Sequence, residues 1–174
     1  MGIVHVLAGL LLSSIGLLAV DPAWGSPDNG IRIGAAISRE PDRVLIVSFQ
    51  NVGEEKTKFV VGGSTNHGPF YSLTFEARNR DGQGCKITNS LGGVGVAGFV
   101  EPIVIKLDPS AIRRIEIPLS YLTCIEKGSS TLGWMLISGY SIKVGFAMNS
   151  RQASMAGPGK SWSGQVSSGL ASIY

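Results

Sequence analysis

The chain has 174 residues, 44% of them hydrophobic and 16% charged, and a formal net charge of +3. This length is enough for one domain with its own core. Its basic residues are scattered singly or as the pair Arg113-Arg114, whereas a nucleic-acid binder usually gathers them on one face, so we expect no nucleic-acid partner.

The chain begins with an apolar run over residues 3–20, followed by Ala23-Trp24-Gly25. Small residues at alternate positions after such a run are typical of a signal-peptidase site. The pattern predicts a signal peptide over residues 1–25 and a mature domain over residues 26–174 that is secreted or periplasmic. No Lys or Arg precedes the run, whose length is close to that of a short membrane span, so a retained membrane anchor is the alternative.

After residue 30, apolar and polar residues alternate with a period of two, which indicates strands with one buried face. The clearest run places five residues on one face: Tyr140, Ile142, Val144, Phe146 and Met148. Together the runs predict about eight strands, over residues 31–37, 44–49, 57–61, 71–78, 103–107, 115–119, 140–148 and 162–173. Because no stretch keeps a helical period, we expect an all-β fold, an antiparallel β-sandwich.

The breaks between these strands carry turn residues. Asp81-Gly82 is typical of a tight hairpin, and Asp108-Pro109-Ser110 separates two further strands. Residues 119–126 could form a single helical turn. The segments 91–98 and 149–160, rich in glycine or in serine and alanine, are expected to be long exposed loops.

Cys85 and Cys124 are the two cysteines of the chain. In an exported protein an even pair predicts one disulfide bond. The alternative is a reactive Cys85 thiolate beside His67.

Several short motifs resemble those of exported bacterial immunoglobulin-like domains. They are Phe49-Gln50-Asn51-Val52-Gly53, Leu107-Asp108-Pro109-Ser110, Gly139-Tyr140 and the closing Trp162-Ser163-Gly164-Gln165-Val166. A similar pattern occurs in proteinase-inhibitor-like sandwiches and in non-catalytic domains of secreted metalloproteases. The resemblance covers residues 30–174 and implies an immunoglobulin-like sandwich. The His-Glu-x-x-His motif of those proteases is absent from the sequence, so the resemblance implies no activity and transfers no functional residue.

His67 is the only histidine after the predicted cleavage site. Serine and cysteine hydrolases usually need an imidazole base, and glycosidases need two carboxylates. A small exported hydrolase that uses His67 or an unmarked carboxylate pair is therefore the alternative function. Of the acidic residues, Glu76, Glu101 and Glu116 are expected in solvent-facing positions or loops.

The sequence predicts no metal site and no cofactor. Zinc needs three or four His, Cys or carboxylate ligands, and one His with two paired cysteines does not supply them. Residues 79–83 carry too few acidic ligands for a calcium loop. The glycines between residues 92 and 98 lack the Gly-Lys-Ser/Thr ending of a phosphate-binding loop.

Three aromatic residues could form a sugar-stacking platform: Trp134, Tyr140 and Trp162. Aromatic side chains more often serve a core, and Tyr140 has the core phase of its strand. Trp162 and His67 remain the candidate binding residues. We expect an exported non-catalytic binding module whose partner is another protein or a cell-envelope component, with membrane contact only if the N-terminal segment is retained.

Overall fold

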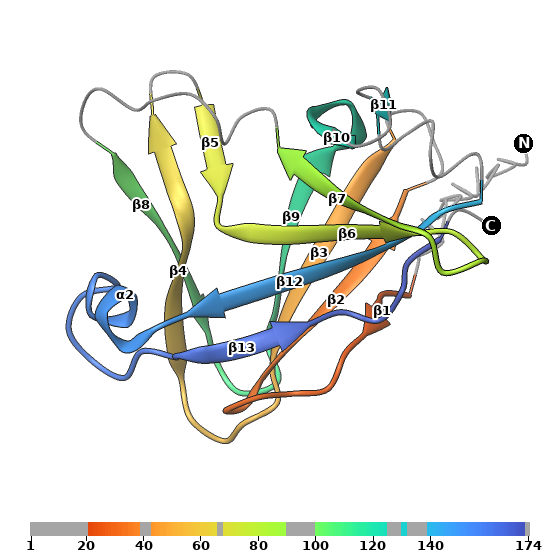
Figure 1. Ribbon diagram of the computed structural model, residues 1–174. Coiled ribbons are helices and arrows are strands. Elements are labelled where there is room, and N and C mark those ends of the chain that lie inside the picture. Colours follow the sequence, from red (N-terminus) through yellow and green to blue (C-terminus); the bar gives the residue numbers. More distant parts are fainter. Residues whose placement is uncertain are drawn as a thin grey trace, which may run out of the picture.

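The computed structural model describes residues 21–38, 43–65, 68–89, 100–124, 130–131 and 139–172. Across these residues the backbone is mostly β-strand, with a short helix α2 (Ser150–Ser154) and a 3-10 turn at Leu119–Tyr121. The strands pair antiparallel and their sheets pack together, so the fold is an all-β sandwich, as the period-two pattern predicts (Figure 1).

The described strands form three sheets. The first has the order β1 (Ala23–Trp24), β2 (Ile31–Ile37), β3 (Val44–Asn51) and β9 (Ile112–Pro118). The second has the order β5 (Gly68–Tyr71), β4 (Thr57–Thr65) and β8 (Glu101–Leu107). The third has the order β11 (Ser130–Thr131), β10 (Leu122–Cys124), β7 (Gly84–Asn89), β6 (Leu73–Arg78), β12 (Ser141–Met148) and β13 (Gly164–Ser167). β12 and β13 of the third sheet pack on β2 of the first (Figure 1).

Each segment predicted as a strand contains one in the structure, although the last is shorter, Gly164–Ser167. The structure adds β1, β5, β7, β10 and β11. Four of these have only two to four residues, and in β7 only Cys85 and Ile87 alternate with polar residues. The turn expected within residues 119–126 is the 3-10 turn. The segment 149–160, expected to be a loop, contains α2, because Asn149 and Gln152 cap the helix start through reciprocal side-chain hydrogen bonds of 2.8 and 3.0 Å.

The core is centred on four aromatic rings. Phe49 of β3, Phe59 of β4 and Phe146 of β12 come from the three different sheets, and their ring centroids lie 5.1 to 5.5 Å apart. Trp162, just before β13, stacks on Phe146 at 5.5 Å. Since such contacts bury large apolar areas, the three sheets share one core at this cluster.

The N-terminal strand β1 is part of the sandwich. Ala23 and Trp24 pair with Ala35 and Gly34 of β2, and the Gly25 N–H donates to the Ile33 carbonyl at 3.0 Å. The Arg32 guanidinium lies 4.6 Å from the centroid of the Trp24 ring, within cation–π range. The packed chain thus begins ahead of residue 26. Cleavage after Gly25, which stays a prediction, would remove this strand.

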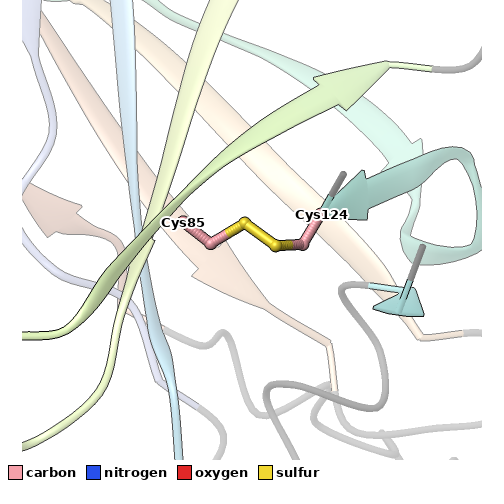
Figure 2. The surroundings of a disulfide bond; sticks show 2 residues. All are labelled: Cys85 and Cys124. Atoms are coloured by element: carbon pink, nitrogen blue, oxygen red, sulfur yellow. A yellow bond between two sulfur atoms is a disulfide. The ribbon is translucent and has the colours of Figure 1, made fainter. Parts of the chain in front are cut away.

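Cys85 of β7 and Cys124 of β10 are joined by a disulfide bond (Figure 2). Their Cα atoms lie 6.0 Å apart and both side chains are buried. The predicted pairing is therefore confirmed, and neither cysteine is a free thiol.

In the part of the chain that the structure describes, no helix is long and apolar enough to cross a membrane.

Candidate binding groove

β8 and β9 follow each other in the chain but lie in different sheets. Within the described residues β8 pairs only with β4, and β9 pairs only with β3. The turn between them, residues 108–111, is closed by a hydrogen bond from the Ala111 N–H to the Asp108 carbonyl at 3.1 Å. From this turn the two strands diverge (Figure 1), so each turns an unpaired edge toward the other.

Buried Asn51, at the end of β3, holds this turn in place. Its backbone accepts a hydrogen bond from the Ser110 N–H and donates one to the Ala111 carbonyl, at 2.9 and 3.1 Å. Its side-chain amide donates to the Leu107 carbonyl at 3.3 Å and to the Glu55 carbonyl at 2.7 Å. Ser110 has a φ of 64°, a left-handed conformation that is uncommon for a residue other than glycine. The point at which the strands separate is therefore fixed by specific contacts.

The divergence leaves an open hollow of about 740 Å³ between β8 and β9. Its floor is apolar, because Ile105 and Ile115 lie in it with only 8% and 9% of their surfaces exposed, next to half-buried Ile103. Tyr71, at the end of β5, also lines the hollow, and burial raises the pKa of its phenol. This hollow can take apolar groups along its length.

A second hollow, of about 510 Å³, lies at the turn end of the same strands. It shares Lys106 and Arg113 with the first, and we call the two hollows together the basic groove. The far wall of the second hollow is the segment 158–160. This wall is held in place because the Trp162 N–H donates to the Lys58 carbonyl at 2.8 Å. Gly157 and Gly159, with φ of 84° and 101°, give the chain the left-handed turns that it needs there.

Three cationic side chains from three strands converge on the second hollow. Lys58 of β4 and Lys106 of β8 are directly opposite each other in the antiparallel register, and Arg113 of β9 joins them. Like charges at directly opposed positions destabilise a sheet. The ammonium group of Lys58 donates a hydrogen bond to the Pro158 carbonyl, which offsets part of this cost.

The remaining lysines of the groove are paired with carboxylates at its rim. Lys56 lies 2.9 Å from Asp108, and Lys160 contacts Glu55. The hydrogen bond and positive charge of Lys160 hold the pKa of Glu55 below its ordinary value. Among the described residues, no ion pair neutralises Lys106 or Arg113. These two cations remain available to an anionic group.

The residues predicted from the sequence do not form this site. His67 and Trp134 lie outside the described residues, and their roles stay predictions. Trp162 is only 3% exposed within the aromatic cluster, so its ring belongs to the core and cannot contact a surface ligand. Of the predicted loops, 91–98 also lies outside the described residues, whereas 149–160 contributes the far wall of the basic groove.

The three acidic residues named from the sequence lie on separate sheets. Glu76, Glu101 and Glu116 are exposed and lie in β6, β8 and β9, on three different sheets. At the β6–β7 hairpin, the side-chain oxygen of Asn79 accepts hydrogen bonds from the N–H groups of Asp81 and Gln83 at 3.1 and 2.8 Å, a turn that explains these residues without calcium. The described residues contain no group of three His, Cys, Asp or Glu side chains that could hold a metal ion.

Sequence reasoning missed Lys58, Lys106 and Arg113. They are far apart in the sequence from one another, and only strand pairing brings Lys58 beside Lys106. One signal could have placed two of them: the turn Asp108-Pro109-Ser110 puts Lys106 and Arg113 at the same ends of two successive strands. The pairing of β4 with β8, which adds Lys58, has no comparable mark in the sequence.

Comparison with known proteins adds no family to this geometry. No family model matches the chain, and neither a curated protein nor a solved structure matches it.

Proposed function

We propose that this protein is an exported, non-catalytic binding module that takes an anionic partner, a protein or a cell-envelope component, in the basic groove. The observation that carries the proposal is the opposed pair Lys58 and Lys106 beside Arg113. A carboxylate, phosphate or sulfate bound between them would relieve their mutual repulsion and form charge-assisted hydrogen bonds.

Protection of sheet edges is the competing explanation of these charges, because edge strands often carry Lys to prevent aggregation. Edge protection needs only a charge, a proline or another interruption on each exposed edge. It does not require cations of three strands to gather at one hollow, nor two of them to face each other across a paired register. The convergence favours ligand binding.

Export is supported by the apolar N-terminal run and by the buried disulfide bond, since disulfides form and persist in oxidising compartments. The all-β sandwich also agrees with the resemblance to exported immunoglobulin-like domains, which stays a proposal for this chain.

The test is the binding of fluorescent poly-L-glutamate to the full-length chain, followed by anisotropy. Arg113→Glu and Lys106→Glu should each weaken binding by about tenfold or more, because each removes a charge-assisted contact and adds repulsion. Arg80→Glu is the matched control: Arg80 is exposed in the β6–β7 turn and does not line the basic groove. Equal weakening by Arg80→Glu, or no binding at low salt, would contradict the proposal.

A further inference from the structure

We infer that the ligand of the basic groove is an extended acidic peptide that adds as a β-strand along the facing edges of β8 and β9. This inference rests on the proposed function and names its class of partner. It is carried by the unpaired edges, by the length over which they line the groove, and by the distribution of charge along it.

Both strands offer backbone groups to such a peptide. In an edge strand, every second residue directs its N–H and C=O away from the neighbouring strand. β8 has β4 on one side only, and β9 has β3 on one side only, among the described residues. An extended peptide laid along either edge would satisfy these groups, as in other cases of strand addition.

The usable part of each edge coincides with the first hollow. Consecutive residues of both strands line it, 103–106 of β8 and 113–116 of β9. Pro102 and Pro118 lie just beyond these stretches, and proline has no N–H to donate to a ladder. A lined stretch of four residues spans about 13 Å of extended chain, which suits a peptide segment of about four to six residues.

The charge along the groove sets the pattern of the peptide. At the turn end lie Lys106 and Arg113, with Arg114 next and Lys58 behind them, whereas the one carboxylate among the described residues of the first hollow, Glu116, lies farther from the turn. Away from the turn the floor is made by Ile103 and Ile105, with Tyr71 beside them. A complementary peptide therefore carries acidic residues at one end and apolar residues at alternate positions of the other, because alternate side chains of a strand point to the same face.

A sulfated or phosphorylated saccharide could satisfy the same cations. It would leave the backbone edges of β8 and β9 unused and would not fill the apolar floor. The structure favours the peptide because the groove combines an apolar floor with unpaired strand edges.

The test uses an acetylated peptide of three glutamates followed by alternating valine and threonine, and two analogues N-methylated at odd or at even positions. N-methylation removes backbone donors without changing charge. We expect the parent peptide to bind the full-length chain and at least one analogue to bind about tenfold more weakly, the loss expected of backbone hydrogen bonds. Amide hydrogen exchange within residues 103–107 and 112–117 should slow when the parent peptide binds.

The outcomes separate the inference from the proposed function. Equal binding of all three peptides, with Arg113→Glu still weakening each of them, overturns strand addition and leaves the anion-binding proposal in place. Failure of both poly-L-glutamate and the parent peptide to bind overturns both. A sulfated hexasaccharide that binds more tightly than the parent peptide and leaves hydrogen exchange of the two edges unchanged overturns the peptide class.

Discussion

Asn51 shows how one polar residue positions the groove. It is 1% exposed, yet its side chain forms three hydrogen bonds, to the Glu55 and Leu107 carbonyls and from the Gly53 N–H. These bonds join the end of β3 to the end of β8. Buried polar groups are tolerated where they are satisfied in this way, and removing one partner leaves the others unpaired.

Asn51→Ala should lower the free energy of unfolding by about 2–3 kcal/mol, because it leaves buried backbone groups without a hydrogen-bond partner. Asn79→Ala is the matched control: Asn79 makes comparable bonds to turn N–H groups, but at the solvent-exposed β6–β7 hairpin. Its replacement should cost less than about 1 kcal/mol. Urea denaturation measures both values. Equal effects of the two substitutions would show that Asn51 has no special role.

Tyr71 gives a pH-dependent signal from the groove. Burial raises the pKa of its phenol above the ordinary value of 10.0. A partly buried phenol favours its neutral form, so its contribution to stability is complete below pH 10.0 and is lost as the pH rises through the higher folded-state pKa. The difference in phenolate absorbance between the parent chain and Tyr71→Phe should therefore have its midpoint above 10.0. A midpoint at or below that value would contradict the burial of Tyr71.

At the scale of elements, strand β1 depends on a glycine opposite it. Gly34 of β2 is buried, and a Cβ atom there would lie 2.7 Å from the Trp24 ring and 2.8 Å from Pro22. The missing side chain leaves room for Trp24 to cover the sheet. This contact links the fold to the position of signal cleavage, because residues 22–25 belong to the predicted signal peptide.

Gly34→Ala should destabilise the full-length chain by about 1–3 kcal/mol through overpacking, and Trp24→Ala in the same chain should relieve the part of that cost that comes from the Trp24 ring, while the contact with Pro22 remains. Thermal denaturation of the two single variants and the double variant gives the coupling. Gly84→Ala in β7 is the control, since its nearest contact to a new Cβ is an ordinary 3.6 Å. In a chain that starts at Ser26, Gly34→Ala should be tolerated; a full cost there would mean that neither Trp24 nor Pro22 crowds the site.

The predictability of the elements follows from the strength of their patterns. β12 was predicted because Tyr140, Ile142 and Val144 begin an alternating run that is buried on one face. β7 was missed because its sequence, Gly84–Asn89, mixes glycine, lysine and threonine with few apolar residues. Its place in the sheet depends on the local hairpin with β6 and, at long range, on pairing with β10 and on the disulfide. The basic groove was not predicted for the same reason: it lies between elements, and its cations meet only through the pairing of β4 with β8 and the divergence of β9.

At the scale of the whole molecule, the three sheets meet at the aromatic cluster, and Trp162 connects this cluster to other parts of the chain. Its indole N–H donates to the Asp28 carbonyl at 3.0 Å, and its backbone N–H donates to the Lys58 carbonyl at 2.8 Å. Trp162 was a candidate binding residue from the sequence, because a tryptophan at a strand start has no distinguishing burial pattern. In the structure it positions the groove wall from within the core.

The edge of the third sheet depends on the disulfide bond. β10 has only three residues, and Cys124 in it is joined to Cys85 across a sequence separation of 39. A strand this short contributes few ladder hydrogen bonds to the folded state. The covalent link adds stability in another way, because it restricts the conformations of the unfolded chain. The double variant Cys85→Ala/Cys124→Ala should lose about 3–4 kcal/mol of unfolding free energy in the chain-entropy model for a loop of this length.

Chemical denaturation of the double variant, compared with the parent chain in the presence and absence of a reductant, measures this loss. Reduction should destabilise the parent chain to about the level of the double variant and should leave the double variant unchanged. Both sulfur atoms are held in the disulfide bond, so the unreduced protein should not be alkylated even after it is unfolded in urea, whereas the reduced protein should be. Ready alkylation of the unreduced protein, or a parent chain equally stable with and without reductant, would contradict the bond and remove the main structural support for export to an oxidising compartment.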